Sequence, residues 1–388
     1  MSDGTPFRDR ILPSEAKLIF KLIFYHNKRA MSKLFPRVNA ENSSESRGTG
    51  RKEPALPKQH HIIVPVLMAG FAAVAIAAAA QSNGLRIGLI GLDTSHVIAF
   101  TGLLNSASGK DHVPGAKVVA AFKGGTADNE SSYTRVDEYT KQLQEEFGVE
   151  IIDTVEELCK KVDAVMLTSV DGRPHLEQAK PVIEAGKPLF VDKPMAGSLR
   201  DVIEIFRLAK EHNVPCFTSS AYRFYDSLAA LKKQDVGDIR AAVSYGPCHL
   251  EPHHPDLFWY GVHPAEALFA IMGTGCETVG RASTPDTDVV TGVWSGGRIG
   301  TLLGLRSGPM PHKVIVFGTK AVAQQGEEGD YAPLVREIIK FFQTGVAPVP
   351  PEETIEIFAF MEAADESKRR GGAPVSIREV LEQNTPSP

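Results

Sequence analysis

The sequence has few cysteines, and no two of them are closely spaced. The four are Cys159, Cys216, Cys248 and Cys276, and no C-x-x-C pair occurs. This pattern argues against a zinc site and against a thiol-exchange motif. A domain of this size does not need disulfides, so free buried thiols are expected, and Cys248 with Cys276 is the one bridge that export would allow.

The main part of the chain also lacks an excess of positive charge. The 388 residues carry a net charge of -5, but residues 1–60 hold 12 Lys and Arg against 6 Asp and Glu, leaving 30 against 41 in the remainder. A body with a net charge of -11 is not suited to bind polyanions, so we expect no nucleic-acid partner. With 43% hydrophobic and 23% charged residues the composition is globular, and the length favours two domains.

Long apolar runs are absent except at residues 62–80, which carry no charge and end in alanines after a basic stretch. This pattern is typical of a secretory signal peptide. The alternative is a membrane anchor, since 19 residues can cross a hydrocarbon core of ~30 Å. No Arg-Arg pair precedes the run, which counts against twin-arginine export. We expect a periplasmic or membrane-anchored protein if the segment acts as a signal, and a cytoplasmic one otherwise.

The predicted organisation has four parts. Residues 1–57 are a disordered leader, or lie upstream of the true start codon, and residues 58–82 are the signal peptide or anchor. Residues 83–220 form a nucleotide-binding domain, and residues 221–388 form a substrate-binding and oligomerisation domain.

From residue 85 onward, short β-branched runs alternate with amphipathic segments of helical length. Strands are predicted at 85–90, 117–122, 164–169, 188–191 and 215–220, and helices at 137–147, 175–185 and 199–212. This alternation predicts an α/β fold with a Rossmann-type, doubly wound parallel sheet. Ligands of such sheets bind at the carboxyl ends of the strands.

The turn after the first strand keeps only the first glycine of a G-x-G-x-x-G fingerprint, Gly91, after Gly88 within the strand. Asp93 and His96 occupy the second and third places. A carboxylate beside a pyrophosphate is repulsive, so we expect Asp93 to cap the following helix while Thr94 and Ser95 face the phosphates. A plain strand-to-helix turn explains the motif equally well.

Lys123 follows the second strand, where an acidic residue would hold a ribose hydroxyl. A lysine there fits a 2′-phosphate and favours NADP, although a surface lysine in a glycine-rich loop is the commoner explanation.

Residues 163–175 and 184–196 resemble the Gfo/Idh/MocA family of sugar and polyol oxidoreductases. The resemblance rests on His175 after the fourth strand and on Ala185-Gly186-Lys187 followed by Asp192-Lys193-Pro194, with Asp in place of the usual Glu. It continues through Tyr222-Arg223-Phe224, residues 236–239 and Gly261-Val262-His263-Pro264-Ala265-Glu266, and it spans residues 85–370.

The resemblance implies an NAD or NADP cofactor and two catalytic residues, Lys193 and His263. Lys193 follows a buried strand at the edge where ligands sit, and partial desolvation would fit it for proton transfer. An ion pair with Asp192 is the alternative. The residues expected around the cofactor are Gly88, Gly91, Asp93, Thr94, Ser95, His96, Lys123, Ser169, His175, Asp192 and Lys193.

The resemblance makes His263 the general acid/base, and Glu266, one helical turn further on, is expected to hold its tautomer. A satisfied core histidine is the alternative. Family members usually carry an Asp where this chain has Trp259, and such an aromatic wall favours a sugar ring. The residues expected at the substrate are Tyr222, Arg223, His254, Trp259, Tyr260 and Glu266.

His249, Glu251 and His253 would share one face of a strand and could then bind a divalent metal. Pro252 and Pro255 make a regular strand doubtful. We therefore predict a polar substrate-binding loop and no metal.

After Tyr222 the strands become longer, at 241–245, 287–294, 299–306 and 313–318. This pattern predicts an α+β domain with a mainly antiparallel sheet, helices on one face and a hairpin at Gly296-Gly297. In the family such a domain forms the oligomer interface, so we expect a homodimer or homotetramer.

Together these features predict an NAD(P)-dependent oxidoreductase that acts on a hydroxyl of a sugar or glycoside. An exported member would need a tightly bound, recycled cofactor, because free nicotinamide cofactors are scarce outside the cytoplasm. The alternatives are a non-redox lyase or hydrolase acting on keto-sugars and a ligand-binding protein with a degenerate nucleotide site.

Overall fold

The structure, a computed structural model, describes residues 84–327 and 329–385. The predicted leader and the apolar run at 62–80 lie outside the described residues. Within these residues no helix is long and apolar enough to cross a bilayer.

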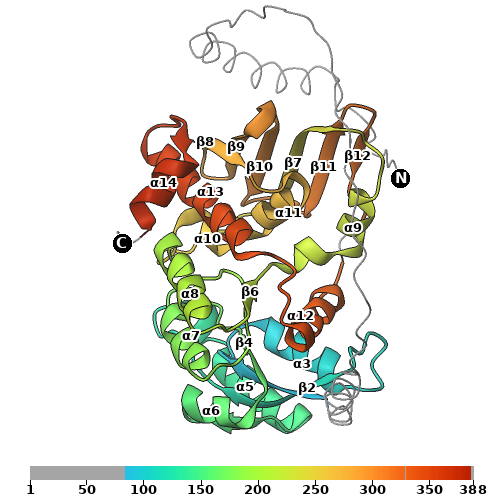
Figure 1. The fold of residues 1–388 in the computed structure, drawn as a ribbon, viewed down its shortest axis with the longest axis vertical. Helices are drawn as coiled ribbons and strands as arrows, with labels where there is room; N and C mark the ends of the chain where they lie inside the picture. Colours follow the sequence, from blue (N-terminus) through green and yellow to red (C-terminus); the bar gives the residue numbers. More distant parts are fainter. Residues whose placement is uncertain (1–83, 328, 386–388) are drawn as a thin grey trace, which may run out of the picture. The chain divides into compact units, whose positions relative to one another are not determined.

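The first part of the fold is a six-stranded parallel sheet (Figure 1). Its strands are β1 (Leu85–Ile90), β2 (Ala116–Phe122), β3 (Glu150–Ile152), β4 (Ala164–Leu167), β5 (Leu189–Val191) and β6 (Cys216–Thr218), in the order β3-β2-β1-β4-β5-β6. The order reverses beside β1, the position where doubly wound sheets bind ligands. The predicted Rossmann-type sheet is confirmed, with the three-residue β3 as an additional strand.

Helices connect these strands. They are α3 (Ser95–Asn105), α4 (Glu130–Tyr133), α5 (Val136–Phe147), α6 (Val155–Lys161), α7 (His175–Glu184) and α8 (Leu199–Glu211). One contact explains a glycine that sequence reasoning gave to the cofactor. A Cβ on Gly88 would lie 3.1 Å from the Leu158 side chain of α6, so this glycine lets α6 pack closely against β1.

The second part of the fold is a seven-stranded mixed sheet. Its strands are β7 (Ile239–Pro247), β8 (Cys276–Ser283), β9 (Thr287–Trp294), β10 (Ile299–Leu305), β11 (Lys313–Gly318), β12 (Val322–Gln324) and β13 (Val375–Ser376), in the order β12-β11-β7-β10-β9-β8-β13. All neighbouring strands are antiparallel except β7 and β10. The predicted hairpin joins β9 to β10, and Gly296 and Gly297 adopt φ values of +75° and +79° that favour glycine.

Further helices pack on this sheet and on the first one. They are the 3₁₀ turns η1 (Ala221–Phe224) and η2 (Ser295–Gly297), and α9 (Asp226–Lys232), α10 (Asp256–Trp259), α11 (Val262–Met272), α12 (Ala332–Thr344), α13 (Pro351–Arg369) and α14 (Ile377–Asn384). Aromatic contacts join α11 and α13 to the second sheet, with Phe269 lying 5.3 Å from Trp294 and 5.6 Å from Phe360 between ring centroids.

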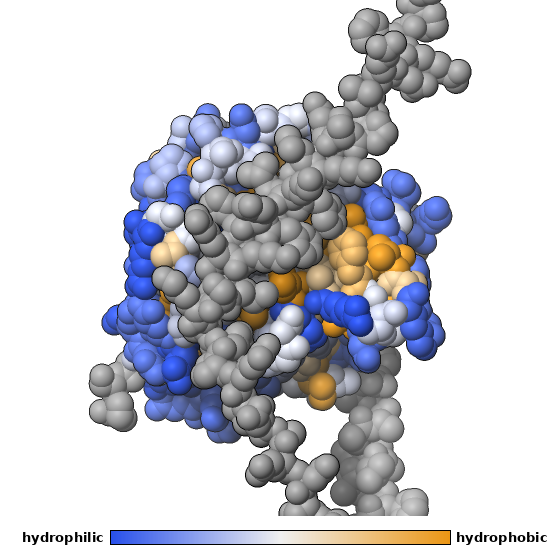
Figure 2. All heavy atoms as spheres, turned by 90° about the horizontal axis from the view of Figure 1, so that it is seen from above, coloured by the Kyte–Doolittle hydropathy of each residue, from blue (hydrophilic) through white to orange (hydrophobic). Residues whose placement is uncertain are grey.

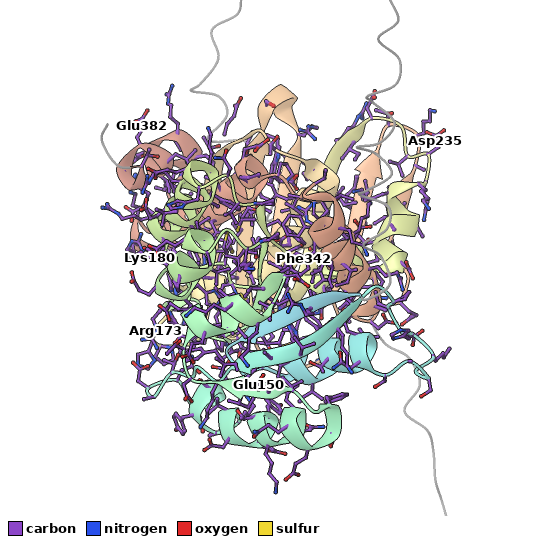
Figure 3. All side chains as sticks on the ribbon, turned by 60° about the horizontal axis from the view of Figure 1, so that its bottom comes forward. Glu150, Arg173, Lys180, Asp235, Phe342 and Glu382 are labelled. Atoms are coloured by element: carbon purple, nitrogen blue, oxygen red, sulfur yellow. The ribbon has the colours of Figure 1, made fainter. Side chains whose placement is uncertain are left out.

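Helix α12 follows the second sheet in sequence but packs against the first. Leu334, Val335 and Ile338 share one buried cluster with β1 residues, and the Phe341 ring lies 4.7 Å from that of Phe217 on β6. Figure 3 shows Phe342 of this helix among packed side chains, whereas Lys180, Asp235 and Glu382 lie at the surface. The chain therefore crosses between the two sheets more than once.

The four cysteines are free and buried. The bridge between Cys248 and Cys276 that export would allow is not formed.

A buried guanidinium holds the edge of the second sheet to α13. Arg281 on β8 has a fully enclosed side chain, and its Nε donates to Asp288 of β9 at 2.9 Å. It also donates to Asp365 of α13 and, at 3.0 Å, to Asp256 of α10. One cation thus neutralises carboxylates from three elements.

We expect Arg281→Met to lower the free energy of unfolding by about 3–5 kcal/mol, because the substitution leaves the buried Asp365 without its cation and removes one of the two cations paired with Asp288. Denaturant unfolding measures the change. Arg240→Met, on an exposed arginine of β7, is the matched control and is expected to change the value by less than ~0.5 kcal/mol. Equal effects of the two substitutions would contradict the role given to Arg281.

Candidate active site

The predicted catalytic residues meet where the carboxyl ends of β1 and β5 face α11. Lys193 directly follows Asp192, the first residue after β5, and His263 lies in the first turn of α11. Both side chains border the Tyr260 ring: the Lys193 Nζ lies 5.4 Å from its centre, and the His263 ring lies 5.4 Å from it. Lys193 is 9% exposed and His263 is 7% exposed, so the two groups act in a nearly dry environment.

Asp192 organises this end of the sheet. One carboxylate oxygen accepts from His96 Nδ1 at 2.5 Å, and the other accepts from the backbone N–H of Lys193 at 2.8 Å. Burial disfavours the charged carboxylate, but His96 and Lys193 outweigh it and hold the pKa of Asp192 below its usual range. Burial lowers the pKa of Lys193, and the Asp192 carboxylate opposes that shift. Lys193 is thus nearer to its neutral amine than a surface lysine.

His263 is a neutral imidazole held by a serine. Its Nδ1 lies 2.7 Å from the Oγ of Ser220, which follows β6 by two residues. Burial lowers the pKa of His263 well below its usual range, and the nearby groups Lys193, His312 and His96 lower it further. The Tyr222 ring lies 5.0 Å away and stacks on the His312 ring.

The prediction that Glu266 holds the His263 tautomer was wrong. Glu266 accepts from Arg223 Nε at 2.8 Å, and Arg223 also donates to Glu353. Glu266 therefore pairs with Arg223, 43 residues away in sequence, and not with His263 in the same helix. Arg223 and Glu266 therefore form a buried ion pair and are not open substrate ligands, as they were predicted to be.

His254 and Trp259, also predicted at the substrate, contact each other and the loop after β4. The His254 side chain is fully enclosed, and its Nε2 accepts from the backbone N–H of Gly172 at 3.2 Å. The Trp259 ring packs on His254 at 4.9 Å and is 7% exposed. Of the predicted substrate residues, Tyr222 and Tyr260 lie beside the catalytic pair.

The prediction that Asp93 caps α3 was wrong. The cap is Thr94, whose Oγ1 accepts from the backbone N–H of His96. The Asp93 carboxylate is fully buried and accepts from the backbone N–H of Val170 at 2.8 Å and from Ser132 Oγ at 2.6 Å. Burial raises its pKa, and these hydrogen bonds oppose the shift. The Asp93 carboxylate thus accepts from two donors, the Val170 N–H and the Ser132 hydroxyl, that would otherwise be available to a phosphate bound over the turn.

The neighbouring groups still fit a dinucleotide. Ser95 is exposed at the start of α3, where helix N–H groups attract phosphate. Asn129, in the loop after β2 where a ribose would lie, is 1% exposed, and neither polar atom of its side chain has a hydrogen-bond partner. A buried amide without partners is unusual in proteins and fits a ligand that supplies them. Phosphates would therefore be held by Thr94 and Ser95, beside Asp93 and not over it.

Other predicted cofactor residues hold the loops together. Gly91 has a φ of +84°, and a Cβ there would lie 2.1 Å from Ser169 Oγ. Ser169 donates to Gln178, and His175 lies fully buried between the carbonyl oxygens of Ser169 and Met195. These side chains position the turn and do not face a ligand.

Lys123 forms an exposed ion pair with Asp137, 2.5 Å apart. This arrangement is that of the surface lysine considered above, and it removes the main support for a 2′-phosphate.

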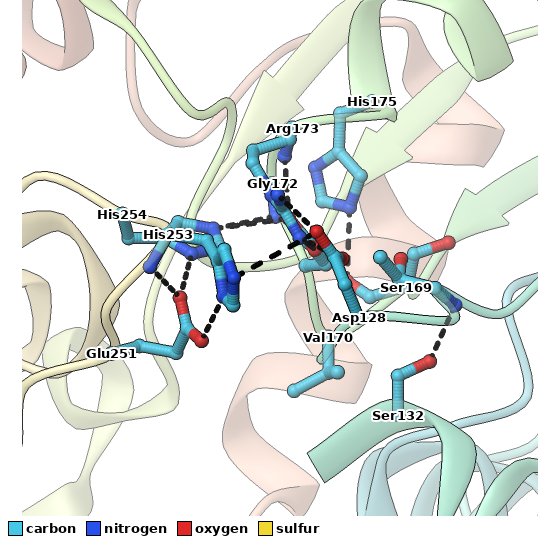
Figure 4. Close-up of polar contacts among 12 residues, drawn as sticks. Asp128, Ser132, Ser169, Val170, Gly172, Arg173, His175, Glu251, His253 and His254 are labelled. Atoms are coloured by element: carbon cyan, nitrogen blue, oxygen red, sulfur yellow. Dashed lines mark hydrogen bonds and ion pairs between the residues drawn. The ribbon is translucent and has the colours of Figure 1, made fainter. Parts of the chain in front are cut away.

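A polar clasp joins the loops after β2 and β4 to the segment before α10 (Figure 4). We use the name for Asp128, Asp171, Arg173, Glu251, His253 and His254. Arg173 donates to Asp128 at 2.6 Å and to Asp171 at 2.6 Å, while Glu251 accepts from His253 at 2.8 Å and from His254 at 3.0 Å. Glu251 is thus occupied by two imidazoles. No group of histidine, cysteine and carboxylate side chains suited to a metal occurs among the described residues.

A cavity of about 630 Å³ lies elsewhere, against β8 and α13, and includes Arg281, Arg306 and Lys368 in its wall. All three cations are paired with Asp256 or Asp288. Because its charges are already neutralised, this cavity has no group prepared to bind an anion, and the buried cluster at Lys193 is the better candidate site.

Residues 85–220 match the oxidoreductase family with an NAD-binding Rossmann fold, GFO_IDH_MocA. The Rossmann domain is thus similar to the Gfo/Idh/MocA oxidoreductase family. An uncharacterized oxidoreductase of Streptococcus pneumoniae is 26% identical over 159 residues, which cover 35% of this chain and 42% of that relative.

The solved structures share the fold over both sheets. A probable dehydrogenase from Thermotoga maritima superposes with a TM-score of 0.63 at 21% identity, covering 76% of this chain and all of that one. A scyllo-inositol dehydrogenase from Lactobacillus casei, solved with NAD(H) and scyllo-inositol, gives 0.63 at 15% identity over 76% and 100% of the two chains. The solved structures confirm the predicted fold, and the match of residues 85–220 supports the predicted similarity to NAD-binding oxidoreductases of this type.

Four residues of the site were missed from the sequence: Asn129, Ser220, His312 and Tyr331. Tyr331 precedes α12, and its ring lies 4.8 Å from that of His96. His312 precedes β11 and stacks on Tyr222. Neither lies in a motif, since each reaches the site only through the path of the chain. Ser220 stands two residues before Tyr222, so the family-like segment there was the one available signal.

Proposed function

We propose that this protein is an NAD(P)-dependent oxidoreductase that acts on a hydroxyl of a cyclic polyol or sugar. One observation carries the proposal: a desolvated lysine and a neutral histidine border the same tyrosine ring at the ligand-binding edge of an NAD-binding Rossmann sheet. Structural neighbours that are inositol dehydrogenases support the substrate class. Tyr222 and Tyr260 supply the aromatic surface and hydroxyl groups that a sugar ring requires.

The protein's own residues would bind, orient and move one proton. Thr94 and Ser95 would hold the phosphates, Asn129 the ribose next to them, and Lys193 the reacting end. The nicotinamide, when bound, accepts or returns a hydride. Lys193 and His263 would both contact the reacting hydroxyl of the substrate, and their burial keeps bulk water from competing for its proton.

Purified protein is expected to release NAD or NADP on denaturation, or to bind it on titration. The Lys193→Met variant is expected to bind cofactor but to lose roughly 100-fold or more in kcat, because it keeps the shape of the side chain and removes its proton-transfer group. Absorbance and mass spectrometry measure the cofactor, and reduction of NAD(P) by cyclic polyols measures turnover.

Lys210→Met, on an exposed lysine of α8, is the control and should leave both values unchanged. The position of Asp93 favours one competing function, a ligand-binding or non-redox protein whose nucleotide site is degenerate. Protein that holds no NAD(P) and binds none would establish that alternative and end the redox proposal.

The outer face of the second sheet supports a homo-oligomer. Val293 and Ile299, cross-strand partners on β9 and β10, are 38% and 39% exposed, and Val322 on β12 is 64% exposed. Figure 2 looks onto the end that carries this sheet and shows hydrophobic side chains gathered in one area. Both faces of the second sheet carry apolar side chains, and each such face needs to be covered. Helices of the described residues cover one face, and a second subunit would cover the other.

We expect the protein to be a dimer or tetramer and Val293→Glu to shift it to the monomer, because the carboxylate would be buried without a partner in the interface. Light scattering after size-exclusion chromatography measures the mass. Val346→Glu, on a valine that is 71% exposed between α12 and α13, is the control. A monomeric native protein would refute the interface.

We also propose that residues 62–80 direct export, on the strength of their uncharged run and terminal alanines. N-terminal sequencing of the protein from its native cell is expected to begin near residue 81. A chain that begins at or before residue 31 in the soluble cell fraction would rule export out.

A further inference from the structure

The hydroxyl group of Ser220 contacts the imidazole of His263. Ser220 is fully buried at the start of η1, and its Oγ lies 2.7 Å from His263 Nδ1. The same oxygen accepts from the backbone N–H of Tyr222 at 3.3 Å. The two contacts fix the serine between a backbone donor and the imidazole.

The hydroxyl has a single proton, and the contacts decide its direction. If His263 Nδ1 carried a proton, Ser220 Oγ would accept two N–H bonds and its own buried proton would have no acceptor among the described residues. Buried donors are rarely left without a partner. The satisfied arrangement has Ser220 donating to Nδ1, so the neutral imidazole holds its proton on Nε2.

The surrounding charge keeps the ring neutral. Burial lowers the pKa of His263 first, and Lys193, His312 and His96 add to the shift. Among residues 84–327 and 329–385 no carboxylate contacts the His263 ring, and Glu266 accepts from Arg223 and Ser219. A neutral ring with its proton on Nε2 offers substrate a hydrogen-bond donor and not a base.

We propose that His263 acts as a neutral hydrogen-bond donor to the substrate oxygen, fixed in that tautomer by Ser220, and that Lys193 is the base. This inference rests on the proposed function. In the oxidation direction the hydroxyl O–H bond breaks and its proton goes to the Lys193 amine. The C–H bond breaks as well, its hydrogen and electron pair pass to the oxidised nicotinamide, and the oxygen pair forms the C=O bond. The Nε2–H of His263 stabilises the oxygen as its negative charge develops.

The surroundings of Lys193 suit it to the role of base. The group that favours its charged form is Asp192, whose carboxylate is shared with His96, while burial and Arg135 favour the neutral amine. Ser220 is then a positioning residue, because it acts on substrate only through His263.

Nitrogen-15 NMR of histidine-labelled protein tests the tautomer directly. The protein is studied near pH 7.5 with NAD added, and the His263 signals are assigned by their loss in His263→Gln. We expect a protonated Nε2 and an unprotonated, hydrogen-bonded Nδ1. A protonated Nδ1, with or without a protonated Nε2, would overturn the inference. This readout does not depend on turnover, so a failure of the redox proposal is recorded separately by the cofactor measurement.

The variant Ser220→Ala is expected to lose the fixed tautomer and to fall roughly 10- to 100-fold in kcat with little change in KM, since the donor to the developing charge is no longer held. Ser220→Thr keeps the hydroxyl and is expected to restore both the spectrum and most of the rate. Ser219→Ala is the matched control, because Ser219 is equally buried and contacts Ser220 and Glu266 but not His263. Unchanged spectrum and kcat in Ser220→Ala would refute the role of Ser220. If Ser220→Ala does not fold, the spectrum of the unaltered protein decides the question alone.

Discussion

The buried carboxylate of Asp192 is the interaction on which the candidate site depends. It is 2% exposed, and both of its oxygens are used, one by His96 at the start of α3 and the other by the backbone N–H of Lys193. An isolated carboxylate at this depth would be costly, so the contacts that neutralise it also fix the elements that carry them. Helix α3 is thereby held against the end of β5, and the main chain at Lys193 is oriented. Without this anion, the buried lysine would have no counter-charge.

A second buried carboxylate, that of Asp93, holds the loops in position, as Asp192 holds the reacting groups. Asp93 ties the turn after β1 to Val170 after β4 and to Ser132 on α4. A glycine at position 93 would leave the Val170 N–H and the Ser132 hydroxyl available to a phosphate. In this chain both groups donate to Asp93, and Ser95 stays exposed beside them. The polar clasp extends the same principle outward, with Arg173 joining Asp128 to Asp171. The ligand edge of this sheet is therefore held by side-chain charge as well as by backbone turns.

How much could be predicted from the sequence depended on whether a contact was local or distant. The parallel strands were predicted, because their apolar runs and helical spacers are periodic, except for β3, whose three residues begin with the charged Glu150. Lys193 and His263 were found because a motif marks them. Asp93 and Glu266 were assigned to helical neighbours, and in both cases a partner far along the chain won: Val170 lies 77 residues from Asp93, and Arg223 lies 43 residues from Glu266. His312 and Tyr331 reach the site only through tertiary packing, which no local pattern encodes.

The small number of described carboxylates near His263 bears on which residue, Lys193 or His263, can accept the substrate proton. Asp192 is already shared between His96 and Lys193, and Glu266 is paired with Arg223. An imidazolium at His263 would share the Tyr260 ring with the Lys193 ammonium, and the described residues place no carboxylate in contact with the imidazole to offset the repulsion. A proton arriving from substrate is therefore better accommodated on Lys193, next to Asp192, than on His263. The neutral imidazole then retains its donor for the substrate oxygen, and the hydroxyl of one buried serine suffices to orient it.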